Sequence, residues 1–187
     1  RDMNGLNDDY DDVDPYFLDI RSKLNITFAL ATIDPEGNPT TGVTYHPTNS
    51  GFGKSNGYNN TIKKYAWDNY KYCNIYIMHD LYDDGKTTNS GVAWYPNKGM
   101  SDENIARIVY NGSYLGTNTN ENFRSVLTHE FGHYLDLRHT FLGGCPDSNG
   151  CSTSGDLICD TPPADKPQLN GALNCQGKKT NWQNFMD

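Results

Sequence analysis

The sequence contains no apolar run that approaches the length of a membrane-spanning helix, and only 35% of its 187 residues are hydrophobic. A helix that crosses a bilayer needs about 20 consecutive apolar residues, so we expect no membrane partner. Basic residues are also scarce, since 15 Lys and Arg stand against 23 Asp and Glu, for a net charge of −8. Nucleic acids and anionic membranes attract basic surfaces, so neither is an expected partner. The charge fits calcium and cationic substrates, and it equally fits an acidic surface that only keeps the protein soluble.

Length and composition are those of a single loop-rich domain. At 187 residues, one domain with a sizeable hydrophobic core is the expected arrangement. The 18 glycines and 13 tyrosines, with abundant Asn, Asp and Thr, suit an extracellular protein with many turns and do not suit a helix bundle. For an extracellular chain, which this composition suggests, the five cysteines predict two disulfides and one free thiol.

The most informative stretch is HEFGHYLDLRH, which runs from His129 to His139. Residues four apart share a helix face, so His129 and His133 can present two imidazoles to one metal ion. Glu130 lies about 100° around the helix axis from His129, where its carboxylate can reach a water on that metal. His139 can be the third ligand only if the helix ends and the chain bends back near residues 136–137. Three neutral imidazoles leave one tetrahedral position open, which is typical of a catalytic zinc site.

The alternative is a helix with three unrelated histidines packed in or near the core. Three of the chain's five histidines fall within these eleven residues, and the position of the third favours the zinc site. A helix over about residues 121–137 would bury one apolar side and so hold the ligands rigidly. The apolar residues at helical spacing are Phe123, Val126, Leu127, Phe131, Tyr134 and Leu135.

Before this helix the chain reads as a series of strands, and after it as irregular structure. The strand-like runs are rich in Ile, Val, Thr, Tyr and Trp and are separated by Gly, Pro and Asn. From residue 143 to the end there is almost no helical pattern, and Gly, Pro, Asn and Cys are frequent. The predicted strands are Asn25–Ile33, Gly42–Tyr45, Cys73–Met78, Gly91–Tyr95 and Ile105–Tyr110.

The histidine motif and the text around it resemble a known family. The pattern H-E-x-x-H-x-x-G-x-x-H followed by a methionine turn defines the metzincin metalloproteases, and residues 184–187 (NFMD) are the candidate for that turn. Within the metzincins, the chain is similar to the pappalysin family over nearly its whole length. Besides the motif, the shared segments include residues 6–10, 26–42, 91–96, 155–162 and residues 139–141, which begin at the last histidine of the motif.

The resemblance implies an α+β, metzincin-like zinc protease domain. In that layout a twisted, mostly parallel sheet and the active-site helix form an upper subdomain, here residues 1–139, which carries the zinc ligands. An irregular, disulfide-pinned lower subdomain, here residues 140–187, ends at the Met-turn. The segment Gly91–Tyr95 would be the edge strand along the cleft, where an extended peptide can pair as an added strand. Because family members continue beyond both ends, we expect one catalytic domain truncated at both ends.

The resemblance also implies a function, that of a secreted, monomeric zinc endopeptidase acting on protein or peptide substrates. Glu130 would act as the general base on a zinc-activated water. Met186 would pack beneath the metal without binding it. Cleavage before arginine is the family preference. A zinc-binding recognition module with weak or no activity is the alternative.

Asp136 departs from the family pattern, which has a glycine at this position. The glycine permits a sharp turn off the helix with a positive φ, and Asp is among the few other residues that tolerate this conformation. We therefore expect Asp136 to make the turn and zinc binding to survive. The alternative is that Asp136 marks a decayed site.

A calcium site is a further expectation from the resemblance. Family relatives hold calcium in the region of the GD…DTP segment, and calcium favours oxygen ligands in flexible geometry. Asp156, Asp160 and Thr161 are the candidate ligands. The alternative is an Asx-turn followed by a loop that a proline ends.

The cysteine pairing also comes from the resemblance. It joins Cys145 to Cys175 and leaves Cys151 and Cys159 as a local bridge. Cys73, beside a predicted strand, would then be a buried free thiol.

Overall fold

A computed structural model describes residues 25–48, 51–54, 59–115, 126–145, 150–153, 155–167, 171–180 and 184–187. The chain divides into two compact units, one formed by Phe28–Leu135 and the other by Asp136–Asp187 together with Arg1–Thr27. None of the helices in the described ranges is both long and apolar enough to span a bilayer. The predicted segment 6–10 lies outside the described residues.

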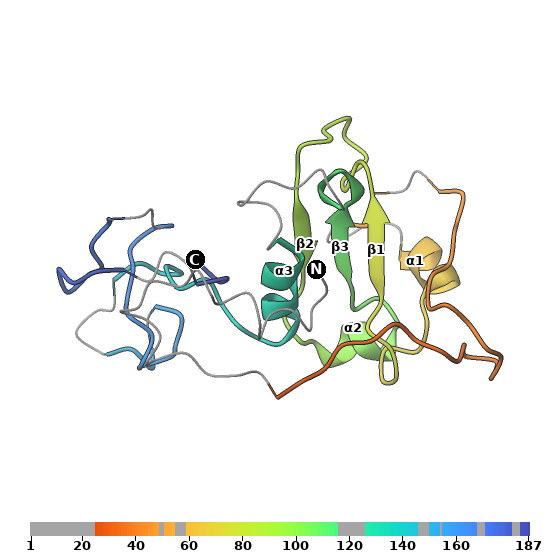
Figure 1. Cartoon of the computed structure of the whole chain (residues 1–187), viewed down its shortest axis with the longest axis horizontal. Helices are drawn as coiled ribbons and strands as arrows, with labels where there is room; N and C mark the ends of the chain where they lie inside the picture. Colours follow the sequence, from red (N-terminus) through yellow and green to blue (C-terminus); the bar gives the residue numbers. More distant parts are fainter. Residues whose placement is uncertain are drawn as a thin grey trace. The chain divides into compact units, whose positions relative to one another are not determined.

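A three-stranded mixed sheet forms the centre of the first unit (Figure 1). Its strands are β1 (Ile75–Met78), β2 (Gly91–Ala93) and β3 (Ile108–Asn111), in the order β1-β3-β2. β1 runs parallel to β3, whereas β2 runs antiparallel to it. All four residues of β3 are buried, as expected of a central strand, and β2 is an edge strand of this sheet. The α+β class and the edge position of the Gly91 strand are thus confirmed.

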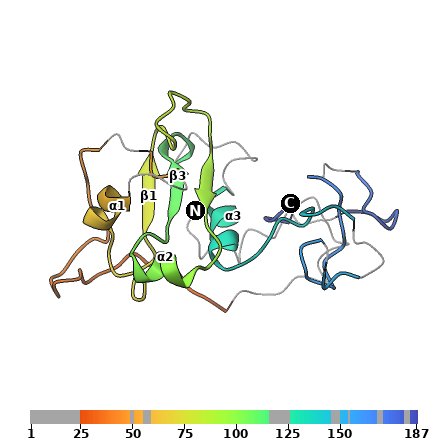
Figure 2. The same ribbon diagram turned by 180° about the vertical axis from the view of Figure 1, so that it is seen from behind.

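Helices pack around this sheet (Figures 1 and 2). α3 (Val126–Tyr134) lies beside β2, and α1 (Asn59–Tyr65) lies near β1. α2 (Lys98–Asp102) begins where the side chain of Asn97 accepts a hydrogen bond from the amide of Met100 at 3.1 Å. A 3-10 turn, η3 (Gly112–Tyr114), follows β3 directly. The sequence analysis missed α1 and α2, because elements of five to seven residues are too short to show a helical period.

Two predicted strands, 25–33 and 42–45, are absent from the described residues, and that prediction was wrong. The chain there makes only an isolated bridge between Ile33 and Pro39. The carboxylate of Asp34 closes the intervening turn by accepting hydrogen bonds from the amides of Glu36 and Asn38. Strand propensity alone does not make a strand, because a strand needs a partner to satisfy its backbone groups.

The hydrophobic core of the first unit lies on the α1 side of the sheet. It also includes a residue of the loop that precedes α1. Phe52, Ile62, Leu81 and Val109 are fully buried and in mutual contact. The segment around Phe52 approaches the chain at Tyr82 very closely, since a Cβ on Gly51 would lie 2.3 Å from the Tyr82 carbonyl carbon. Only glycine fits at that position, because any side chain would push the two backbones apart.

Arg107 is the most buried charged residue described and ties three segments together. Only 2% of it is exposed. Its guanidinium donates to the carbonyls of Phe52, Ile105 and Lys54 at 2.7, 2.7 and 2.8 Å. It also lies 3.9 Å from the centre of the Trp94 ring. Burial lowers the pKa of Arg107 to about 10, so the group still carries its charge at neutral pH.

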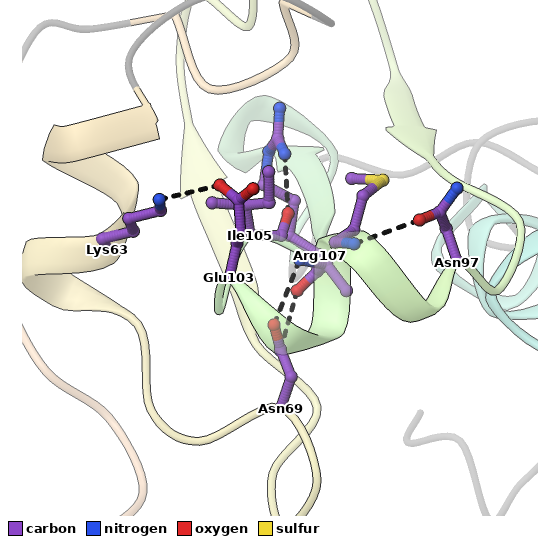
Figure 3. A network of polar contacts seen from close by, with 8 residues as sticks. Lys63, Asn69, Asn97, Glu103, Ile105 and Arg107 are labelled. Atoms are coloured by element: carbon purple, nitrogen blue, oxygen red, sulfur yellow. Dashed lines mark hydrogen bonds and ion pairs between the residues drawn. The ribbon is translucent and has the colours of Figure 1, made fainter.

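The neighbourhood of Arg107 is shown in Figure 3. The side-chain amide of Asn69 donates a hydrogen bond to the backbone carbonyl of Ala106 and accepts one from the backbone amide of Ala106. It thus bonds to Ala106 as a neighbouring strand would. Lys63 and Glu103 form an exposed ion pair of 2.8 Å beside it.

The second unit has neither a helix nor a strand among its described residues. It is cross-linked by Cys145–Cys175 and by Cys151–Cys159, the same pairs as those expected from the resemblance. An irregular chain of this kind gains much of its stability from such cross-links, because they restrict the unfolded state.

Cys73 departs from its prediction. It carries no disulfide, as expected, but the residue is exposed and not buried. It precedes β1 at the edge of the sheet, where no further strand is described to cover it. Partial burial of the thiol group nevertheless raises the pKa of Cys73 to about 11, an effect that a hydrogen bond from Tyr134 partly offsets.

Replacing Arg107 by lysine should destabilise the protein strongly. Lysine keeps the charge but cannot reach three carbonyls at once, so buried acceptors lose their donors. We expect the free energy of unfolding to fall by about 2–4 kcal/mol in urea titrations. Lys63→Met is the matched control, because an exposed ion pair contributes less than about 1 kcal/mol. Equal losses in the two variants would contradict the role of Arg107.

Candidate metal centre

Helix α3 presents the first two histidines of the motif. His129 and His133 lie one turn apart, with ring centres 4.6 Å from one another. On the buried side of the helix, Phe131 packs against Phe28 with ring centres 4.4 Å apart. Tyr95, just beyond β2, meets the His133 ring edge to face at 5.4 Å. The apolar contacts fix the helix, and the helix then fixes the two imidazoles.

Asp136 makes the turn that ends this helix. Its φ is +72°, which confirms the expected left-handed conformation in place of the family glycine. The amide of Leu135 still bonds back to the carbonyls of Phe131 and Gly132, at 2.9 and 3.1 Å. α3 therefore ends at Tyr134, three residues earlier than predicted, because the left-handed residue cannot continue a right-handed helix. Residues 121–125 of the predicted helix lie outside the described residues.

The three predicted ligands come together in the structure. His129, His133 and His139 each offer a ring nitrogen, and these nitrogens lie within 4.8 Å of one another. Two nitrogens bound to one tetrahedral zinc ion are about 3.4 Å apart, so small side-chain adjustments suffice to hold the ion. Three neutral imidazoles are also the donor set that zinc favours in catalytic sites. The residues present fit zinc, and no other such group of His, Cys, Asp and Glu occurs in the described ranges.

Glu130 lies on α3 beside the first ligand and is almost fully buried, with 5% of it exposed. Burial raises the pKa of its carboxyl to about 7, because a charged carboxylate loses its hydration there. A carboxyl with a pKa near neutrality can both accept and release a proton at physiological pH.

The residues of the candidate Met-turn form a tight turn. The side chain of Asn184 accepts a hydrogen bond from the amide of Met186 at 2.9 Å. The carbonyl of Met186 accepts one from the amide of Thr140, also at 2.9 Å, and the Thr140 hydroxyl donates to Asp187. Met186 is buried. The turn is thus bonded to the residue that directly follows His139.

The three calcium candidates do not form a cluster of carboxylates. Asp156 accepts a hydrogen bond from the amide of Ile158 at 3.0 Å, which is the Asx-turn weighed as the alternative. Asp160 is exposed, and the amide of Thr161 bonds to the carbonyl of Ile158. The calcium site therefore stays a prediction.

Sequence reasoning missed two residues that contact the site. Tyr95, against His133, stood within a predicted strand without an assigned role. Gly91 lies against the carboxylate of Glu130 and was read only as part of that strand. A glycine in a strand often marks a close approach, and this was the available signal.

Comparison with known proteins identifies relatives among the metalloproteases. The family model described as "Pregnancy-associated plasma protein-A", peptidase family M43, matches residues 56–187. An extracellular metalloprotease of Sordaria macrospora is 37% identical over 98 residues, which are 50% of this chain and 30% of that protein. A Neurospora crassa extracellular metalloprotease matches to the same extent. The aligned part thus spans less than a third of these curated relatives.

Solved structures of mirolysin are similar over the whole chain. Mirolysin in complex with a compound has a TM-score of 0.72 at 25% identity, and the match covers 100% of this chain and 71% of mirolysin. Mature mirolysin of Tannerella forsythia in complex with a cleaved peptide has a TM-score of 0.70 with the same identity and coverage. Since the family model covers most of the chain, including all three histidines, the chain belongs to the pappalysin family of metzincin metalloproteases.

Proposed function

We propose that the protein is a secreted zinc endopeptidase in which Glu130 is the general base. The observation that carries the proposal is the gathering of three imidazoles beside a buried carboxyl on the same helix. Family membership and the metalloprotease relatives support it independently.

In this proposal His129, His133 and His139 hold the ion. The chemistry that zinc supplies when bound is Lewis acidity, which polarises a peptide carbonyl and lowers the pKa of a water. The left-handed turn at Asp136 brings His139 within reach of the other two rings. The packing of Phe131 keeps α3 from rotating the first two away.

Glu130 handles the proton in the proposed reaction. Its carboxylate takes a proton from the attacking water and then passes it to the leaving amine. A buried carboxyl suits this work, because burial raises its pKa to about 7, where it can both accept and release a proton at neutral pH.

The edge strand β2 supports binding of an extended peptide. One side of β2 pairs with β3, and no described strand pairs with its other side. A substrate added there makes main-chain hydrogen bonds that are independent of its sequence. Mirolysin, a structural relative, is known with a cleaved peptide. The names of the relatives, which are extracellular enzymes, support secretion.

Replacing Glu130 by glutamine should abolish cleavage without loss of zinc. The amide has nearly the same shape but cannot accept the proton, so kcat should fall about 10²- to 10⁴-fold on a fluorogenic peptide that contains arginine. Zinc content, measured by atomic absorption, should be unchanged.

The control for this variant is Glu103→Gln, which removes an exposed glutamate of the same unit and should retain activity. A zinc-loaded Glu130→Gln protein that cleaves at the normal rate would rule out Glu130 as the base.

Substitutions at Asp136 should follow the cost of its left-handed backbone. Glycine adopts a φ of +72° freely, so Asp136→Gly should keep both zinc affinity and activity. Asp136→Val should lower the free energy of unfolding by about 1–2 kcal/mol and weaken zinc binding, because a β-branched residue resists this conformation. Asp165→Val, at an exposed residue with ordinary φ, is the control. Full zinc affinity in Asp136→Val would show that the turn does not set the position of His139.

We further propose a preference for arginine after the scissile bond. The family resemblance supports it, and the net charge of −8 favours cationic peptides in general. Peptides that differ only at that position, carrying Arg, Lys, Leu or Glu, should differ in kcat/KM with Arg at least about tenfold above Leu. A rank order led by Leu would overturn the preference and leave the zinc mechanism intact.

A further inference from the structure

We propose that Gly91 is a positioning residue for Glu130, because the absence of a side chain at the start of β2 leaves the space that the Glu130 carboxylate occupies. The inference rests on the proposed function, in which Glu130 is the base. Under this proposal, a glycine of the sheet determines where the carboxylate of that base lies.

The geometry at Gly91 is unusually close. A Cβ built there would lie 2.8 Å from Oε1 of Glu130, 2.9 Å from its Cγ and 3.1 Å from its carboxyl carbon. Carbon atoms not bonded to one another approach to about 3.5–4.0 Å, so an alanine would have to displace the carboxylate or the strand. Gly91 does not have a positive φ, so the backbone conformation itself does not require glycine. The requirement is one of space around the Glu130 side chain.

The strand cannot easily move to accept a side chain. Gly91 pairs with Tyr110 on β3, and Ser90 before it accepts a hydrogen bond from the amide of Asn111. Asn111 is fully buried, and its side-chain amide donates to the carbonyls of Thr87 and Asn89, both at 2.8 Å. The segment that leads into β2 is therefore held by the buried end of β3.

The helix cannot easily move either. Glu130 is followed on α3 by buried Phe131, Gly132 and His133. Phe131 is packed against Phe28, and the His133 ring against Tyr95. A side chain at position 91 would therefore displace the Glu130 side chain, which is the part of this contact that can move most easily.

A double-mutant cycle tests this contact without any reference to catalysis. The four zinc-loaded, full-length proteins are wild type, Gly91→Ala, Glu130→Ala and the double variant. We expect Gly91→Ala to lower Tm by roughly 5 °C when Glu130 is present, and by less than about 1 °C when Glu130 is alanine, because the space is then empty. If Gly91→Ala does not fold, the double variant should fold, and failure of both would overturn the proposal.

Gly112→Ala is the matched control for the cycle. A Cβ there would lie 3.1 Å from the Ile77 side chain, a tight contact that does not involve Glu130, and Gly112 likewise has no positive φ. Its effect on Tm should be the same with Glu130 and with alanine at position 130.

Activity separates positioning from simple packing. Gly91→Ala should lower kcat about 10- to 100-fold, because a displacement of a reacting group by about 1 Å can lower the rate by two orders of magnitude. KM should change less than about threefold, and the zinc content should be unchanged. A loss confined to KM would mean that Gly91 serves substrate binding and would overturn the proposal. Equal Tm losses with Glu130 and with alanine at position 130 would also overturn the proposed role of Gly91. This result does not depend on whether Glu130→Gln is inactive, so the proposal for Gly91 can fail while the proposed function stands.

Discussion

The site depends on one backbone constraint, the left-handed turn at Asp136. A helix can bring His129 and His133 to one ion by itself, but the third imidazole arrives only if the chain reverses within a few residues of His133. Asp136 provides that reversal with a φ of +72°, and the turn bonds of Leu135 close the end of the helix. Removing the left-handed turn would leave only two of the proposed ligands on α3, which are too few to retain a catalytic zinc ion.

A second constraint is the tight packing of α3 against β2. The helix meets the strand where the strand has no side chain, so the carboxyl of Glu130 lies close to the backbone of β2 at Gly91. Burial of this carboxyl raises the pKa of Glu130 to about 7. Arg107 and Asn111 hold the loops around the sheet through hydrogen bonds from their buried side chains to backbone carbonyls.

Much of the site could be predicted from the sequence, because a zinc motif fixes residue types at fixed spacing. The histidine cluster and the conformation of Asp136 are local properties, readable from helix geometry and from the tolerance of Asp for positive φ. The β2 and β3 strands were also visible as apolar runs, with ends shifted by a few residues. Three features could not be predicted, because they depend on contacts between residues far apart in the chain, which no local pattern encodes. They are the lack of paired strands in residues 25–45, the exposure of Cys73 and the close approach at Gly91.

The two disulfides give the protein a dependence on its redox surroundings. Both lie in the unit that carries His139, and that unit shows no regular secondary structure in its described part. In a reducing compartment the four thiols would stay apart, and the order of this unit would rest on isolated turns. The sheet unit, whose core contains no disulfide, would then hold only two of the three imidazoles. Because His139 lies in the disulfide-bonded unit, we expect the assembly of all three imidazoles to require an oxidising environment.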